Sequence, residues 1–417
     1  MYIGRVGRVI RDRVRFDAAE TAGKESALYG RLYPYYAELC ALSEIRKRPG
    51  FGAEFRSGMG GHSLLYLSGV CVDRSSGYPV LQLCDETTSP ADHGVGISVN
   101  SHYRNANWIP VEGRDFVFSG ALKPGEALTR SSYKRTQERA QAMGVLDGIE
   151  FHEHFFRDKS RHMSGLDYMY DISVGTDYAV RFGRDVYRAK VPLDRRRTER
   201  IVTFLNALNA PYRDGQKVYR WRLFNDNCSH VAHNALATAG LWAPWPTGQF
   251  FAFAAFNFPV PKNEFVDLVV QANDLPVDDP RAMYADAIVK RALLEMDIVP
   301  TAPGGLATVD RAIAENDVYE TERLRLIFYA NPFWGKYHRH LAGIFREPRY
   351  FDLHANLRFF AALYETARDD LPAAGWDRDM AKFIARYKIH IEREMARVQH
   401  QLGALARFDN ERAEAVL

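Results

Sequence analysis

A proline-marked aromatic stretch, APWPTGQFFAFAAFNFPVPKNE at positions 243–264, divides the chain into two parts with different patterns. Before it, short apolar runs between turn residues predict strands, and after it apolar residues recur at helical spacing almost without interruption. The chain of 417 residues is also longer than one ordinary core requires. We therefore expect an N-terminal helical segment at 1–50, an α+β domain at 51–248, a linker at 249–262 and an all-α domain at 263–417.

The strand candidates lie between Gly60 and Leu193. HSLLYLSGVCV, at 62–72, is followed by the turn DRSSGYP and by VLQLC, which predicts a hairpin. Further strands are expected at 95–100, 107–120 and 185–193, with a helical pattern at 133–148 among them. This mixture favours an α+β domain whose strands are antiparallel.

The clearest helix is the last one, because a single apolar stripe continues from Met380 to Leu405. Such a stripe needs a partner surface. Neighbouring helices of the same chain are one interpretation, and a homodimer formed through this helix is the other.

Composition excludes several classes of protein. Charged residues make up 26% of the chain and the formal net charge is +3, which indicates no nucleic-acid partner. No apolar run approaches roughly eighteen residues, so no transmembrane segment is expected. The first residues show no secretory signal pattern, which predicts a cytoplasmic protein, although secretion without a classical signal peptide would leave the same pattern.

The four cysteines show no metal-binding or disulfide spacing. We expect reduced thiols, with Cys71 and Cys84 as small buried residues of strands.

Cys228 lies at the start of a predicted helix, in NDNCSHVAHNALATAG. Asp226 or Asn227 is a good N-cap, and Gly240 suits the C-terminal end. The helix N-terminus stabilises a thiolate, so the pattern predicts a lowered pKa for Cys228 and alkylation by iodoacetamide below pH 7. The backbone N–H of Cys228 would also face an oxyanion formed on an attacked carbonyl.

Such a nucleophile needs a base, and His62 is the best candidate, because it opens the strand GGHSLLYLSG directly after a glycine pair. The spacing C-x-H-x-x-H offers an alternative, a zinc site formed by Cys228, His230 and His233. Helical phase argues against it, since His230 is rotated by about 200° from Cys228. We therefore predict no metal.

GGHSLLYLSG, VLQL and NDNCSHVAHNALATAG, in this order, resemble the circularly permuted branch of the NlpC/P60 papain-like superfamily. The lecithin:retinol acyltransferase-like group and related bacterial domains of unknown function are similar in layout. The resemblance implies a permuted papain-like fold with Cys228 as nucleophile, His62 as general base and Gln82 at the third polar position. The lecithin:retinol acyltransferase-like group has a second histidine at the position of Gln82. His93 is therefore the alternative candidate for the third polar residue.

The chemistry implied is a thiol hydrolase, such as a thiol protease, or an acyltransferase, working through an acyl-enzyme without a cofactor. A peptide, a lipid or a protein side chain would supply the acyl group. For substrate contacts we select Asn227, Trp108 and Asp177. The segment TDYAVRFGRD, with Asp177 and Arg184, is either a salt-bridged loop or part of the substrate wall. A non-catalytic papain-like interaction module remains a separate interpretation.

Overall fold

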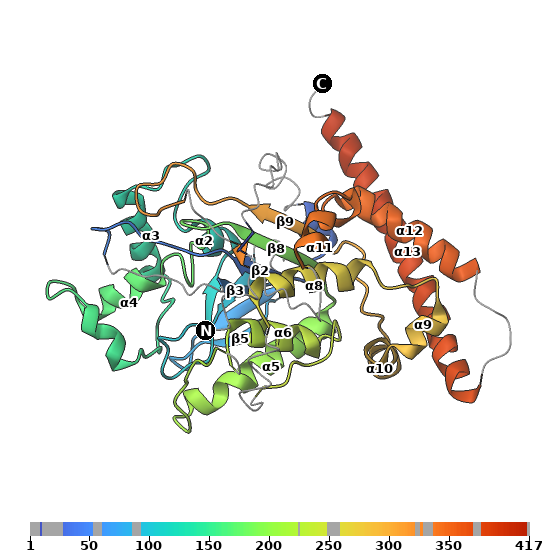
Figure 1. Cartoon of the computed structure of the whole chain (residues 1–417), viewed down its shortest axis with the longest axis horizontal. Coiled ribbons are helices and arrows are strands. Elements are labelled where there is room, and N and C mark those ends of the chain that lie inside the picture. Colours follow the sequence, from blue (N-terminus) through green and yellow to red (C-terminus); the bar gives the residue numbers. More distant parts are fainter. Residues whose placement is uncertain are drawn as a thin grey trace.

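The computed structural model describes residues 9–10, 28–52, 61–85, 93–223, 226–247, 259–321, 326–327, 337–369 and 377–414. Helices surround a six-stranded sheet in the order β7-β6-β3-β2-β8-β9 (Figure 1). Every pair of neighbours in this sheet is antiparallel, which confirms the α+β prediction. The strands are β2 (Tyr36–Leu42), β3 (His62–Ser68), β6 (Gly94–Ser98), β7 (Ile109–Glu112), β8 (Val186–Pro192) and β9 (Leu306–Asp310).

The four inner strands, β6, β3, β2 and β8, are buried along their whole length. Both faces of the sheet are therefore covered, which is why β3 reads as a nearly continuous apolar run instead of an alternating one. In the register, Leu42 of β2 lies opposite both His62 of β3 and Val186 of β8. The first residues of β3 and β8 consequently meet the last residue of β2 at one end of the sheet.

The two faces of the sheet carry different helices. On one face, α6 (Cys228–Thr238) packs against β3 and α8 (Pro261–Asn273) packs against β2 and β8, while α5 (Arg195–Arg213) contacts α6. On the other face, α2 (Arg114–Ser119) packs against β6 and β7. These two layers fix which strand side chains meet the start of α6.

Two smaller pairings lie outside the main sheet. Strand β1 (Val9–Ile10) pairs with β10 (Leu326–Ile327), and β4 (Val70–Asp73) pairs with β5 (Val80–Leu83) as the expected hairpin. The helical elements α3 (Arg130–Ala142), η3 (Glu153–Asp158) and α4 (Gly165–Ser173) follow β7 in the chain.

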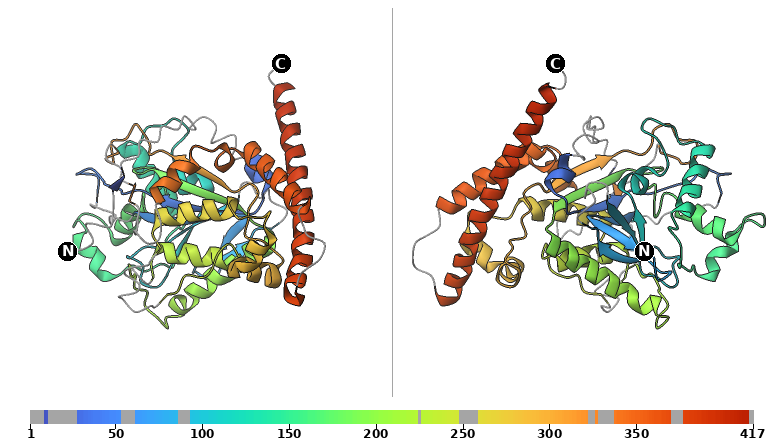
Figure 2. Two further views of the ribbon diagram at one scale, coloured as in Figure 1. Left: turned by 45° about the vertical axis from the view of Figure 1, so that its right-hand side comes forward. Right: turned by 180° about the vertical axis from the view of Figure 1, so that it is seen from behind.

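The C-terminal helix α13 (Arg378–Glu414) runs along one side of the molecule (Figures 1 and 2). It packs against α12 (Leu353–Asp369), α10 (Ala287–Met296) and α9 (Pro280–Ala285). Its stripe is buried at Phe383, Tyr387, Ile391, Val398 and Leu405. The intramolecular interpretation of the stripe therefore has structural support, and the homodimer stays a prediction. The short elements α11 (Tyr337–Ile344) and η4 (Pro348–Tyr350) complete this part.

Two sequence-based expectations about the outer segments are wrong. Segment 1–50 was expected to be helical, yet it supplies β2, a central strand. Segment 263–417 was expected to be all-α, yet it supplies β9, which pairs with β8 and so covers an open sheet edge. The linker at 249–262 lies mostly outside the described residues, and the domain boundaries stay predictions.

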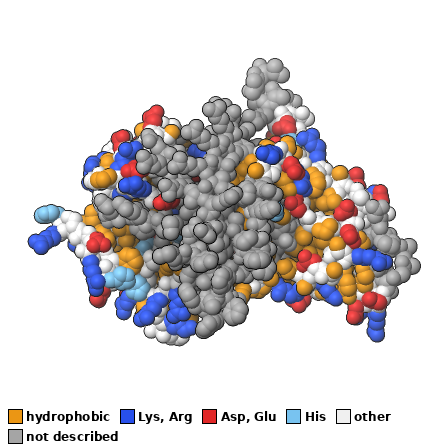
Figure 3. Space-filling view, viewed as in Figure 1, with side chains coloured by type: hydrophobic (Ala, Val, Ile, Leu, Met, Phe, Trp, Pro, Cys, Tyr) orange, Lys and Arg blue, Asp and Glu red, His pale blue; other side chains and the backbone are white. Residues whose placement is uncertain are grey.

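On the face shown in Figure 3, basic and acidic side chains of the described residues are interspersed. Among the helices that the structure describes, none is long and apolar enough to cross a membrane.

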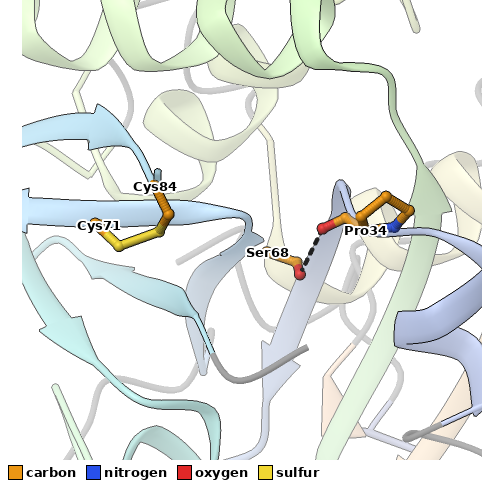
Figure 4. The surroundings of a disulfide bond; sticks show 4 residues. All are labelled: Pro34, Ser68, Cys71 and Cys84. Carbon is orange, nitrogen blue, oxygen red and sulfur yellow. Dashed lines mark hydrogen bonds between the residues drawn. A yellow bond between two sulfur atoms is a disulfide. The ribbon is translucent and has the colours of Figure 1, made fainter. Parts of the chain in front are cut away.

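The expectation of four reduced thiols is also wrong, because Cys71 and Cys84 form a disulfide (Figure 4). Cys71 lies in β4, and Cys84 directly follows β5. Pairing of these two strands brings the cysteines together although their spacing in the sequence matches no motif. Cys40 and Cys228 are free and buried.

Replacing both Cys71 and Cys84 by serine should lower the free energy of unfolding by about 3 kcal/mol, because the bond closes a short loop in the unfolded chain. Chemical denaturation of both proteins under non-reducing conditions measures the difference. Equal stabilities, or free thiols at both positions in the untreated wild type, would contradict the bond.

Candidate active site

Helix α6 begins at Cys228, as the sequence predicts. Asn227 is the N-cap, and its Oδ1 accepts hydrogen bonds from the backbone N–H groups of Ser229 at 2.8 Å and His230 at 3.0 Å. Gly240, with φ +77°, follows the other end. The Asn227 cap does not use the N–H of Cys228, the group expected to face an oxyanion.

The Cys228 thiol lies against the backbone of strand β3. The N–H of Ser63 donates to Cys228 Sγ at 3.3 Å, and the hydroxyls of Ser63 and Ser229 lie 2.9 Å apart. Burial raises the pKa of the Cys228 thiol, and hydrogen bonds from Ser63 and Ser229 only partly oppose this. The direction is opposite to the lowered pKa expected from the helix N-terminus, because desolvation outweighs it.

His62 occupies the first position of β3 and is 8% exposed. Its Nε2 lies 3.4 Å from Ser98 Oγ, and Ser98 Oγ donates to Asp177 Oδ1 at 2.6 Å. Because the Ser98 proton points to Asp177, Ser98 Oγ accepts from Nε2–H, and this assignment leaves His62 Nδ1 as the acceptor. Burial and the charge of Arg184 lower the pKa of His62 to about 3, so the imidazole is neutral at pH 7.

Asp177 is the centre of a buried polar network. It is fully buried, and Asn100 and Tyr103 also donate to its Oδ1. His102 Nε2 lies 3.4 Å from Oδ2. Burial alone would raise the pKa of Asp177, but the interactions with His102, Ser98 and Tyr103 outweigh it and lower the pKa to about 2.

The thiol and the imidazole approach β3 from different sides. Side chains alternate along a strand, so Ser63 faces α6 while His62 faces the α2 layer. Gly96 lies opposite Tyr66 on the His62 face, and a side chain at Gly96 would meet Val117 of α2. Within the described residues, no hydrogen bond joins Cys228 Sγ to the His62 ring. Their connection is indirect, because the N–H of Ser63, the residue after His62 in β3, donates to Cys228 Sγ.

The structure does not bring Gln82 and His93 to this site. Gln82 is exposed in the separate β4–β5 pair, opposite Cys71. His93 precedes Gly94, which lies opposite Ser68 at the other end of β3 from His62. The polar side chain that lies next to the His62 ring is Ser98, which falls within the strand expected at 95–100.

The three predicted substrate contacts have structural roles in this conformation. Asn227 caps α6 and also donates to the Leu223 carbonyl. Trp108 is fully buried, and its indole N–H donates to the Leu205 carbonyl. Asp177 holds the network around Ser98 and acts on His62 through it.

The zinc alternative lacks a suitable donor set. Both nitrogens of His233 are engaged, Nδ1 with Glu264 at 2.5 Å and Nε2 with the Ala243 carbonyl at 2.8 Å. His230 and His233 are both buried. Among the described residues, the one group with metal-ligand proximity is Cys71, Cys84 and His93, and its two sulfur atoms are joined in the disulfide.

Arg184 belongs to the segment that the sequence left open between a salt-bridged loop and a substrate wall. Its guanidinium interacts electrostatically with His62, Asp177 and Cys228. It is fully buried, and its charge lowers the pKa of His62. Burial lowers its own pKa to about 10, while Tyr319, Asp177 and Cys228 raise it. Nothing in the local sequence pattern distinguishes Arg184 from the solvated arginines of this chain.

No protein-family model, curated protein or solved structure matches this chain. The family and the reaction implied by the sequence motifs therefore rest on the residues alone.

The raised pKa of the Cys228 thiol predicts a pH profile for its alkylation. A group whose pKa is raised holds its proton to higher pH, so the rate should increase with a midpoint above about 8.5, the ordinary thiol value. Iodoacetamide labelling of the native protein, followed by mass spectrometry of the Cys228 peptide, measures the profile. A midpoint below pH 7 would instead support the lowered pKa expected from the sequence.

Proposed function

We propose that this protein is a cysteine-dependent hydrolase or acyltransferase of the permuted papain-like kind. The observation that carries the proposal is the hydrogen bond from the Ser63 N–H to Cys228 Sγ. It sets a thiol at a helix N-terminus against the backbone of Ser63, the residue that follows His62 in β3. The neutral imidazole of His62 is held through Ser98 by a buried carboxylate.

In the proposed reaction, Cys228 Sγ attacks the carbonyl carbon of an ester, thioester or amide. The thiol proton passes to Nδ1 of His62, the bond to the leaving group breaks, and the imidazolium returns the proton to that group. Water or a second acceptor then resolves the acyl-enzyme. The Cys228 N–H, which the Asn227 cap leaves unused, is the proposed oxyanion donor.

Asp177 and Ser98 are positioning residues in this scheme, because neither touches the reacting atoms. Ser98 fixes the tautomer of His62, and Asp177 fixes the direction of the Ser98 hydroxyl. The thiol and the imidazole lie on different sides of β3 in this conformation, so the proposed proton transfer requires the two groups to approach each other around the start of β3 when substrate binds.

The Cys71–Cys84 disulfide is relevant to the cellular compartment in which the protein works. Disulfides persist in oxidising environments and are rare in the cytosol. We therefore propose that the protein works in an oxidising compartment in place of the cytoplasm.

Burial of the thiol favours a second candidate function, a non-catalytic papain-like interaction module. Cys228 is 7% exposed and makes no hydrogen bond to His62 within the described residues. In that case Cys228 is a structural thiol that packs α6 against β3.

Replacing His62 by glutamine should slow acyl transfer by roughly 10²- to 10⁴-fold, because the general base is lost. Turnover of p-nitrophenyl acetate, with mass spectrometry of an acetyl group on Cys228, measures the effect. Cys228→Ala should form no adduct, and His93→Gln, a histidine at the other end of β3, is the matched control. Wild-type protein that forms no adduct with activated esters would support the interaction module.

Ser98→Ala should reduce kcat and leave KM nearly unchanged, because it frees the His62 ring without altering the thiol. Ser98→Thr, which keeps a hydroxyl, should restore most of the rate. The pH profile of kcat distinguishes this role from a purely structural one, since a freed imidazole has a different pKa. An unchanged profile in Ser98→Ala would remove Ser98 from the proposed site.

A further inference from the structure

Arg184 is a buried cation with one edge of its guanidinium unused. The residue is 0% exposed, and its Nη1 reaches only the Ser43 carbonyl, at 3.5 Å. Nε and Nη2 have no hydrogen-bond partner in the described part of the chain. These two N–H groups form the planar fork with which arginine binds a carboxylate through two parallel hydrogen bonds.

An unpaired buried charge is costly, so a protein keeps one where something binds it. Arg184 stands two residues before Val186, which lies opposite Leu42, which in turn lies opposite His62. The guanidinium therefore belongs to the same end of the sheet as His62. Its charge acts on His62, and it interacts electrostatically with Cys228 and Asp177.

A second set of groups at this end also favours an anion. Helix α8 begins at Pro261, and its N-cap residue Val260 provides no side-chain hydrogen bond to the helix start. Lys262 in its first turn is 1% exposed, and its Nζ lies 3.5 Å from the position that a side chain on Gly61 would occupy. Gly61 directly precedes His62. Burial and the charge of Arg184 lower the pKa of Lys262 to about 7, and a bound anion would favour its charged form. The positive end of α8, Arg184 and Lys262 thus lie at the same end of the sheet as the proposed base.

We propose that the free edge of Arg184, supported by Lys262 and the α8 N-terminus, binds a carboxylate of the acyl donor beside the carbonyl that Cys228 attacks. This inference rests on the proposed function, and it narrows the substrate class. It favours a donor with a second, free carboxylate, such as an acidic peptide, over a neutral lipid ester. A donor without that charge would leave the fork of Arg184 unpaired in the complex.

Alkylation of Cys228 tests the subsite with two reagents of almost equal size, anionic iodoacetate and neutral iodoacetamide. In both reactions a sulfur–carbon bond forms, iodide leaves and the thiol proton is lost. The ratio of the two rates cancels any change in the thiol pKa. Arg184→Gln should lower the iodoacetate-to-iodoacetamide ratio at Cys228 by roughly tenfold, the value of one charge-assisted hydrogen bond.

Arg197→Gln is the matched control, because Arg197 is a buried arginine of α5 whose Nε donates to the Ala239 carbonyl. Its ratio should equal the wild-type value. An unchanged ratio in Arg184→Gln overturns the subsite, even if Cys228 is acylated by an ester and the proposed function stands. A lowered ratio without acylation leaves the subsite in place and removes the proposed function.

Thermal unfolding decides the case if Cys228 reacts with neither reagent in the native protein. Sodium acetate, compared with sodium chloride at equal ionic strength, should raise the Tm of the wild type and not of Arg184→Gln. Without acetate, Arg184→Gln should be at least as stable as the wild type, because it removes an unpaired buried charge. Equal acetate shifts in both proteins overturn the proposal, and inorganic phosphate as a third salt shows whether the fork prefers a planar carboxylate.

Discussion

The arrangement at the end of the sheet depends on how the buried charge of Asp177 is compensated. This carboxylate is fully buried, so its hydrogen bonds come from the protein itself. Ser98, Asn100 and Tyr103 supply them from the end of β6 and the loop that follows. Because these donors are fixed by a charge, the Ser98 hydroxyl is fixed too, and the His62 ring is oriented by it.

That network was out of reach of local sequence patterns, whereas helix α6 was not. An N-cap asparagine and a glycine after the last turn are signals within one element, and they placed Cys228 at the first helical position correctly. Asp177 and Ser98 are 79 residues apart, and no periodicity relates them. Gln82 was expected as the third polar group, but it lies in the separate β4–β5 pair, whereas Ser98 of β6 lies next to the His62 ring.

The same dependence on contacts that are distant in the sequence explains why β2 was not expected. Glu38 of strand β2 is fully buried. In the sequence alone, a glutamate at this position favours a helix or an exposed segment over a buried strand. Arg188 of β8 and Arg114 of α2 neutralise Glu38 through contacts that span the sequence. The Cys71–Cys84 bond differs, because the hairpin was predicted and places Cys71 opposite Gln82, two residues before Cys84. The predicted pairing of these two strands therefore already brought the two cysteines close together, and the disulfide could have been predicted from it.

The balance of charge beside Cys228 links the resting state to the proposed reaction. A neutral imidazole and a protonated thiol cost little to bury, which suits a site closed to water, while the unpaired cation of Arg184 does cost stability. A carboxylate in the Arg184 fork would cancel that positive charge and so remove one cause of the lowered His62 pKa. The bound anion would then make His62 a stronger base at the moment when a carbonyl lies next to the thiol. Binding of an acidic donor and activation of the nucleophile would in this way be one electrostatic event.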